Sequence, residues 1–223
     1  MDKVDYKKSE KELYYPKKTP SVIEIPEMVF IMTDGKGNPN TSESYAQAME
    51  ILYGLSYTIK MSKMKGNQPA GYFEYVVPPL EGLWSVEGAE FDGLNITDKD
   101  KFCWTSMIRQ PEFVTEEVFE WARGELQKKK PELDFSNTRL ERYREGLCCQ
   151  IMHLGPYDDE PATIVKMEEY IRDNGYITDI TDQRRHHEIY LGDPRKTKPE
   201  NLKTVIRHPV RKNQEKYLEF ITS

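Results

Sequence analysis

The first long apolar stretch of the chain predicts a buried strand that leads into a helix. Residues 28–32 form a continuous apolar run, and residues 34–39 then carry the Asp, Gly, Asn and Pro residues that are typical of a turn. Thr41 or Ser42 supplies the hydroxyl that caps a helix N-terminus. The helix that follows is expected to bury one face. The apolar positions of that face are Tyr45, Met49, Leu52, Leu55 and Ile59.

Two more helices are predicted by their end signals. Thr115 opens a helix with acidic residues in its first turn and lysines in its last, and Pro131 lies just beyond it. A third helix runs over about 159–174 and ends at Gly175, which suits a left-handed cap. Further strands are expected at 71–76, 83–86, 102–109, 140–143, 147–154, 186–191 and 202–207.

The order of these elements repeats. Residues 31–35 and 151–155 are both strand ends that pass through a Gly turn into a long helix. Each helix then leads to a strand with a glutamate between aromatic residues, at 72–75 and 187–190, and to another strand. We therefore expect an α+β fold with a duplicated β-α-β-β module.

The domain organisation follows from this repeat. We expect an extended arm, one domain made of two repeats with a strand-helix insert between them, and a C-terminal tail. The ranges are 1–26 for the arm, 27–210 for the domain, about 27–99 and 140–210 for the repeats, about 100–131 for the insert and 211–223 for the tail.

Composition narrows the class of protein. Of the 223 residues 31% are charged, the net charge is −6, and no run approaches the ~20 apolar residues that span a bilayer. The start lacks a secretory apolar region, and three cysteines form no disulfide framework, so a soluble cytoplasmic protein is expected. No basic stripe is present, which argues against nucleic-acid binding. The 14 Tyr, 8 Phe and 3 Trp suit a site for a planar ligand.

Four motifs in the second half resemble the GyrI-like small-molecule-binding family. They are His-Leu-Gly-Pro-Tyr-Asp at 153–158, Asn-Gly-Tyr at 174–176, the segment 187–194 with its His-Glu-Ile-Tyr start and Asp-Pro end, and 202–206. The resemblance is good over 147–210, diffuse over 27–110 and absent over 1–26. It implies two curved antiparallel sheets, related by a pseudo-twofold axis, with a ligand cleft between them.

The resemblance also implies a function. In multidrug-sensing regulators the module binds hydrophobic, often cationic ligands through aromatic residues and a buried glutamate, beside a DNA-binding domain that is not expected here. Stand-alone members are associated with hydrolytic opening of the cyclopropane in DNA-alkylating compounds. We expect binding of planar, hydrophobic xenobiotics, with hydrolysis, sequestration or sensing, and a protein-partner role such as topoisomerase inhibition as open alternatives.

Glu188 is the first candidate residue of the site. It shares one strand face with His186 and Tyr190, while His187 faces the other way, so these neighbours cannot chelate one metal ion. Burial raises the pKa of a carboxyl and makes it a proton donor or a poised base, whereas an ionised carboxylate attracts a cationic ligand. A base at Glu188 and a hydroxyl donor at Tyr157 or Tyr190 are the residues that hydrolysis needs.

The remaining candidates line the expected cleft. Glu74 is the repeat mate of Glu188, and Tyr72 shares its strand face. Trp84 and Trp104 lie on expected strands, while Phe113 and Trp121 belong to the insert, where they would form a lid or rim. His186 completes the set of ligand-binding residues. No metal and no cofactor is expected, the oligomeric state stays open, and Arg109, Arg184 and Arg185 are taken as surface charges.

Overall fold

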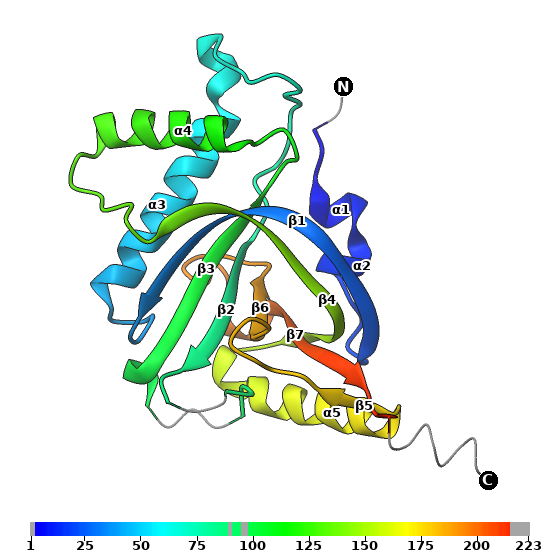
Figure 1. The fold of residues 1–223 in the computed structure, drawn as a ribbon. Coiled ribbons are helices and arrows are strands. Elements are labelled where there is room, and N and C mark those ends of the chain that lie inside the picture. The colour runs from blue at the N-terminus through cyan, green and yellow to red at the C-terminus, as the bar shows by residue number, and fades with distance from the viewer. Residues whose placement is uncertain (1–2, 89–90, 95–97, 215–223) are drawn as a thin grey trace.

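The computed structural model describes residues 3–88, 91–94 and 98–214, and its strands form one curved antiparallel sheet (Figure 1). The strands are β1 (Ser21–Lys36), β2 (Leu80–Val86), β3 (Phe102–Gln110), β4 (Thr138–Leu154), β5 (Tyr176–Thr178), β6 (His186–Tyr190) and β7 (Lys203–Lys212). The helices are α1 (Tyr6–Ser9), α2 (Lys11–Tyr14), α3 (Glu43–Lys60), α4 (Glu116–Lys129) and α5 (Glu160–Asp173).

The sheet closes on itself. Its seven strands have the order β4-β1-β3-β2-β6-β7-β5, and β4 also pairs with β7, so six strands form a barrel-like ring. Each ladder in the ring is antiparallel. The protein is therefore α+β as expected, but one closed sheet takes the place of the two expected sheets.

A shift in side-chain alternation helps β1 and β4 to curve around the barrel. Ile25 and Met28 both point into the interior although they are three residues apart, so the alternation slips by one residue at Pro26. Ile25 pairs with Gly146 of β4, which has a φ of 74°. A side chain at this φ is strained, and glycine allows the strand to turn there.

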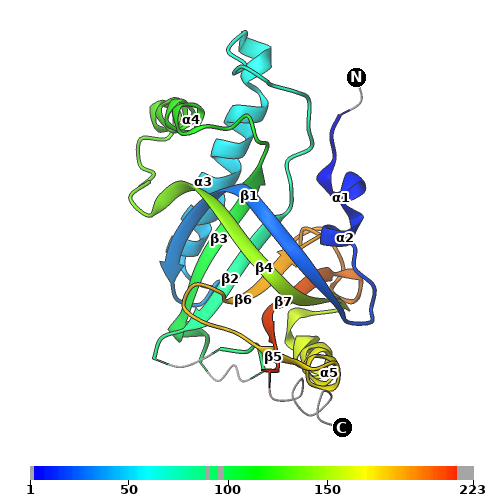
Figure 2. The same ribbon diagram turned by 45° about the vertical axis from the view of Figure 1, so that its right-hand side comes forward.

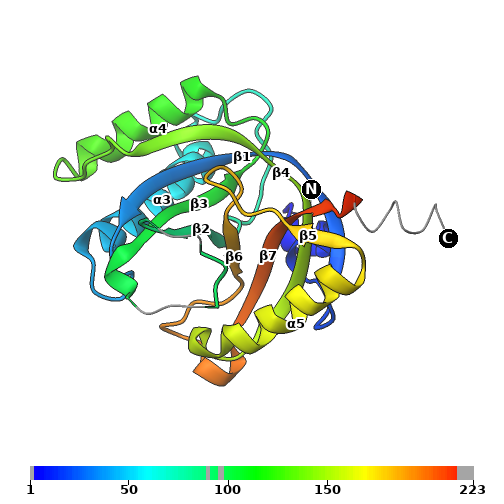
Figure 3. The same ribbon diagram turned by 60° about the horizontal axis from the view of Figure 1, so that its bottom comes forward.

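Helices cover parts of the outer surface of the ring (Figures 2 and 3). Helix α3 packs on β1 and β3 with α4 beside it, and α5 packs on β4 and β5. Apolar residues of each helix bury against outward-facing strand residues, such as Ile31 and Ile108 below α3 and Ile206 near α5. The buried residues of each of these helices lie on one face, as the sequence predicted.

The N-terminal segment packs against the interior of the ring. Helices α1 and α2 place Tyr6, Leu13 and Tyr14 in the same apolar cluster as residues from six strands. Arg109 of β3 is buried here, donates to Glu10 at 2.6 Å from its Nη1 atom, and lies 4.1 Å from the ring centre of Tyr6. The segment is thus partly helical rather than extended, and Arg109 is not a surface charge.

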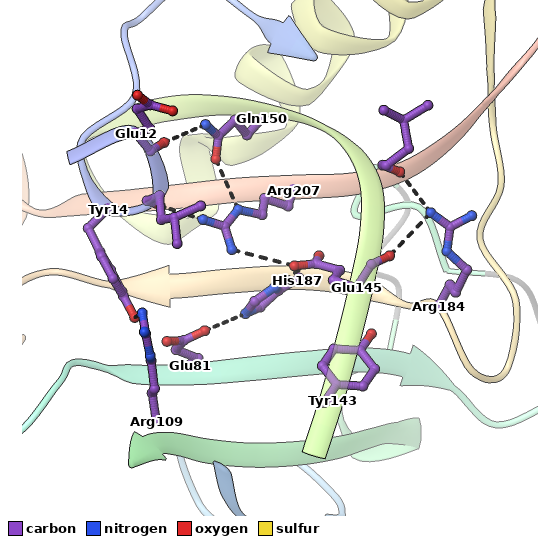
Figure 4. Close-up of polar contacts among 12 residues, drawn as sticks. Glu12, Tyr14, Glu81, Arg109, Tyr143, Glu145, Gln150, Arg184, His187 and Arg207 are labelled. Carbon is purple, nitrogen blue, oxygen red and sulfur yellow. Dashed lines mark hydrogen bonds and ion pairs between the residues drawn. The ribbon is translucent and has the colours of Figure 1, made fainter. Parts of the chain in front are cut away.

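A charged network lies inside the ring (Figure 4). His187 faces Glu81 at 3.0 Å through Nε2 and Glu145 at 3.0 Å through Nδ1. Arg207 lies 3.4 Å from the second oxygen of Glu145 and donates to Gln150 at 3.0 Å. Because buried charges are costly without partners, this mutual pairing makes the charged interior possible.

Several expected elements differ in the structure. Residues 71–76 form no named strand among the described residues, and Tyr75 makes only an isolated bridge to Val4. The first half has the order β1-α3-β2-β3, whereas the second half has β4-α5-β5-β6-β7 with the short strand β5 in addition. Strand β3 lies within the expected insert, yet it is one of the six strands of the ring and pairs with β1 and β2. Residues 215–223 of the expected tail lie outside the described residues.

Replacing Tyr14 with Ala is expected to lower the free energy of unfolding by about 3 kcal/mol, because it removes a buried ring. Tyr14 is 1% exposed, whereas Tyr15 is 44% exposed. Tyr15→Ala is the matched control and should change stability by less than about 0.5 kcal/mol. Guanidinium unfolding measures both, and equal effects of the two substitutions would show that the segment does not pack as described.

The His187 network predicts a loss of stability at alkaline pH. Burial acts to lower the pKa of His187, but the carboxylates of Glu145 and Glu81 outweigh burial and raise it from 6.5 to about 9. The stabilisation is therefore complete below pH 6.5 and is lost as the pH rises through 9, by up to about 1.4 kcal/mol per pH unit. Urea unfolding between pH 6 and 10 should show this decline, and His187→Gln should remove this component. A parallel decline in both proteins would contradict it.

Candidate functional site

Strand β6 carries the candidate site on its outward face. It lies between β2 and β7, and its side chains alternate between the barrel interior and the outer surface. His187 and Ile189 point inward, while His186, Glu188 and Tyr190 share the outer face. The alternation places these three residues together as the sequence predicted.

Glu188 is held by hydrogen bonds from two residues of its own strand. His186 Nε2 lies 2.8 Å from Glu188 Oε1, and the Tyr190 hydroxyl donates to Oε2 at 2.7 Å. Trp84 Nε1 of β2 in turn donates to the Tyr190 oxygen at 2.9 Å. The Glu188 side chain keeps 13% of its surface exposed. The carboxylate is thus fixed in position but not sealed.

Aromatic rings surround this carboxylate. Trp84 packs edge-on against Phe102 at 5.3 Å between ring centres, and it stacks with Tyr45 of α3 at 6.3 Å. Tyr157, in the turn before α5, meets the Tyr190 ring at 5.7 Å. Tyr45, Tyr157 and Tyr190 are only partly buried, so their rings can contact a bound molecule.

Trp104 belongs to the core behind these rings. It is 1% exposed and meets Tyr45 edge-on at 4.9 Å between ring centres. Its ring lies over Gly35, the residue opposite it in β1, where a Cβ atom would come within 2.2 Å of the indole. Trp104 therefore lies beneath Tyr45. Trp84 is also buried, at 6% exposed, so the tyrosines form the accessible surface.

Glu160 is a second carboxyl group at the site, and the sequence analysis missed it. It is the first residue of α5, is 6% exposed and lies beside Glu188. Burial and the negative charge of Glu188 raise the pKa of Glu160 well above its usual value. The sequence did offer a signal for Glu160. The Gly-Pro-Tyr turn leads into α5, so an acidic residue shortly after the turn is expected in the first turn of this helix.

The two carboxyl groups have opposite pKa shifts. Burial acts to raise the pKa of Glu188, but hydrogen bonds from His186 and Tyr190 outweigh burial, and the net shift is downward. These directions favour the ionised form of Glu188 and the neutral form of Glu160. Of the two alternatives for Glu188, the downward shift of its pKa favours the ionised carboxylate over the protonated acid.

Tyr157 and Tyr190 remain protonated hydroxyls. Burial raises the pKa of each phenol, and the nearby carboxylates raise it further. Tyr190 is already engaged with Glu188 and Trp84. Over the described part of the chain no hydrogen bond is found for the Tyr157 hydroxyl, which makes it the better donor to a bound molecule.

Three other candidate residues lie together elsewhere. Glu74 pairs with Lys63 at 2.9 Å, and the Tyr72 hydroxyl donates to the Lys60 carbonyl at 2.7 Å, both beside the end of α3. Phe113 packs on Tyr72 at 5.4 Å between ring centres. These residues form a cluster of their own near α3, apart from the contacts of Glu188.

Trp121 lies on α4 and lines a surface hollow of about 280 Å³ between α3 and α4. Tyr57 and Met61 of the α3 region line the same hollow. Among the described residues no group of three His, Cys, Asp or Glu side chains is arranged to hold a metal ion. No helix in the described ranges is long and apolar enough to cross a membrane.

Comparisons with known proteins identify the family of the chain. The model of the GyrI-like small molecule binding domain matches residues 18–211, so the chain belongs to this family and carries a small-molecule-binding domain. An uncharacterised protein of Listeria innocua is 49% identical, with a TM-score of 0.88 over 94% of this chain and 100% of that one. No curated protein matches the chain.

Two further solved structures are similar. A hydrolase of Listeria innocua is 47% identical, with a TM-score of 0.86 over 94% of this chain and 100% of that chain. The C-terminal domain of EcmrR is 14% identical, with a TM-score of 0.50 over 87% of this chain and 98% of that chain. The second likeness concerns the fold alone.

Gly82 is expected to be essential for the packing of the aromatic residues. It lies opposite Glu188 in the ladder, and a Cβ atom there would come within 2.7 Å of Trp84 Nε1 and 3.2 Å of the Tyr190 oxygen. Gly82→Ala should cost about 1–3 kcal/mol through overpacking and should alter the near-ultraviolet circular dichroism of Trp84.

Gly124 of α4 provides the matched control. A Cβ atom there meets nothing within 4 Å, so Gly124→Ala should stabilise the helix by about 0.5–1 kcal/mol and leave the aromatic signal unchanged. An unchanged spectrum and unchanged stability in Gly82→Ala would contradict the packing described for Trp84 and Tyr190.

Proposed function

We propose that the chain is a hydrolase that binds flat, hydrophobic molecules over β2 and β6 and opens strained electrophilic rings such as cyclopropanes. The observation that carries the proposal is the pair of adjacent carboxyl groups, Glu188 and Glu160, whose pKa values are shifted in opposite directions. Such a pair identifies a base and an acid within one site. The 47% identical hydrolase of Listeria innocua supports the same reaction class.

The ligand would lie against the partly buried rings of Tyr45, Tyr157 and Tyr190, with Trp84 behind them. Planar molecules gain favourable contact with such rings, and a cationic group gains about 0.5–2 kcal/mol from an aromatic face. The ionised Glu188 adds attraction for positive charge. The site therefore suits hydrophobic xenobiotics, with or without a basic group.

The chemistry needs one proton acceptor and one place for negative charge. Glu188 takes a proton from a water molecule while the water oxygen bonds to a ring carbon of the cyclopropane. The strained carbon–carbon bond breaks, and its electron pair moves into the conjugated system and ends on an oxygen. Glu160, kept neutral by its surroundings, donates a hydrogen bond to that oxygen, as does Tyr157.

The remaining proton transfers take place with solvent. The product oxygen takes a proton from solvent on release, and Glu188 gives up the proton that it gained. The net reaction is addition of one water molecule to the substrate. Neither a metal ion nor a cofactor has a role in this scheme.

Two wider expectations belong to this proposal. Cys103, Cys148 and Cys149 are free thiols, which supports a reducing, cytoplasmic location. The element orders of the two halves differ only by the short strand β5, and β2 pairs with β6 in antiparallel fashion, which supports a duplicated module with a pseudo-twofold axis. Strands β2 and β6 would be equivalent elements of the two halves.

Glu188→Gln is expected to lower the rate of ring opening by about 10²-fold or more, because an amide cannot accept the proton of water. The protein is mixed at a sub-stoichiometric level with a cyclopropane-bearing alkylator, and the ring-opened product is followed by mass spectrometry. Glu74→Gln is the control, since that glutamate forms a surface ion pair with Lys63 and should keep full activity.

The outcomes separate the functional alternatives. Many turnovers by the wild type and few by Glu188→Gln support hydrolysis. Intact alkylator that co-elutes with the wild-type protein would mean that the domain binds without chemistry. Equal losses in Glu188→Gln and Glu74→Gln would overturn the assignment of Glu188.

A further inference from the structure

A series of close contacts leads from Glu188 to Glu168 on α5. Glu188 Oε1 lies 2.8 Å from His186 Nε2, and His186 Nδ1 lies 2.8 Å from His208 Nε2 on β7. His208 Nδ1 then lies 2.6 Å from Glu168 Oε1 on α5. Three hydrogen-bond contacts thus connect two carboxyl groups through two imidazole rings.

The middle of this series is sealed, and its far end reaches solvent. His186 is 1% exposed and His208 is fully buried, whereas 28% of the Glu168 side chain is exposed. Phe91 packs edge-on against His186 at 5.3 Å between ring centres. Gly93 fits so closely that a Cβ atom there would lie 2.9 Å from His186 Cε1. Proton exchange with water is therefore favoured at Glu168.

This series of four hydrogen-bonded side chains holds one proton more than two neutral imidazole rings carry. Each of the three contacts needs one proton, since two lone pairs at such distances repel each other. Two neutral histidines provide two protons. With both carboxyl groups ionised, one contact would lack a proton, so the series retains a third.

We propose that Glu188 and Glu168 share this third proton through His186 and His208, so that protonation on α5 sets the charge of the central carboxylate. His208 and Glu168 are then positioning residues for the site. The functional consequence rests on the proposed hydrolysis, whereas the shared proton itself does not.

The exchange needs no ring rotation. One proton moves from Glu168 Oε1 to His208 Nδ1, a second from His208 Nε2 to His186 Nδ1, and a third from His186 Nε2 to Glu188 Oε1. Each proton crosses only its own contact, and no bond between heavier atoms changes. Glu168 gains the negative charge that Glu188 loses.

The electrostatic surroundings disfavour a proton that stays on Glu168 or an additional proton that stays on His208. Burial acts to raise the pKa of Glu168, but hydrogen bonds from His208 and Thr178 lower it overall. Burial also lowers the pKa of His208.

Other titratable groups face the series from each side. They are Asp92 near His208, Cys149 of β4 near Glu168, and Glu160, Tyr190, Tyr157 and Tyr45 near Glu188. Tyr190 provides no second route, because it leads to the Trp84 N–H group, which only donates. The path through the histidines is thus the connection from Glu188 toward Glu168.

Glu168→Gln is the test variant, because an amide N–H group can donate to His208 Nδ1 but cannot release a proton to it. In this variant the imidazole rings of His186 and His208 should both carry their hydrogen on Nε2 only, and Glu188 should stay ionised. Glu169→Gln is the matched control, since Glu169 is the exposed neighbour on the same helix.

Nitrogen-15 NMR of labelled histidine in the ligand-free protein measures the shared proton directly, and only four histidines need assignment. In the wild type and in Glu169→Gln, the ring nitrogens of His186 and His208 should titrate together, with tautomers that change in concert. In Glu168→Gln both rings should keep the Nε2–H tautomer throughout. Independent titration, or identical fixed tautomers in all three proteins, would overturn the proposal whether or not the protein hydrolyses anything.

The pH dependence of ring opening tests the consequence for the site. With Glu188 held ionised, the acidic limb of kcat/KM should move to lower pH in Glu168→Gln, giving about a tenfold higher rate on that limb for a shift of one pH unit. Glu169→Gln should match the wild type. If the wild type hydrolyses the alkylator and Glu168→Gln has the same profile, the link to Glu188 is wrong, whereas a wild type without hydrolysis contradicts only the proposed function.

Discussion

Strand β6 is packed on both of its faces, and this constraint shapes the rest of the structure. One face looks into the closed barrel and the other lies beneath aromatic rings, so polar side chains on either face need partners. His187 finds Glu81 and Glu145 inside the barrel. Glu188, its neighbour, finds His186 and Tyr190 outside. Because unpaired buried charge is costly, the two networks fix the strand in register.

The same constraint explains why two carboxyl groups at one site behave differently. Glu188 has donors on both oxygens, which stabilise its ionised form. Glu160 is buried beside an existing negative charge, and its Oε1 atom has no hydrogen-bond partner. A neighbouring negative charge disfavours ionisation of a carboxyl group, so the charge is favoured on the one with more hydrogen-bond donors. The difference arises from the number of donors around each group.

Period-two alternation and one turn motif allowed part of the site to be predicted from the sequence. Alternation placed His186, Glu188 and Tyr190 on one face, and the Gly-Pro-Tyr turn brought Tyr157 to the same place. Glu160, His208 and Glu168 were missed because each becomes relevant only through packing between elements that are distant in the sequence. No local pattern encodes the contact between β6, β7 and α5.

Glu74 shows how a local pattern misleads. It lies between aromatic residues as Glu188 does, but its segment is not part of the sheet. Gly71 takes a φ of 77°, and Pro78 and Pro79 have no N–H group to offer a neighbouring strand. The rings of the segment pack with Phe113 instead.

Strand β2, and not the segment that carries Glu74, pairs with β6. The residue of β2 opposite Glu188 is Gly82. A second side chain at that point would displace Trp84 and Tyr190. The absence of a side chain at position 82 therefore leaves room for the hydrogen bond between these two residues, and this hydrogen bond orients the hydroxyl that holds the Glu188 carboxylate.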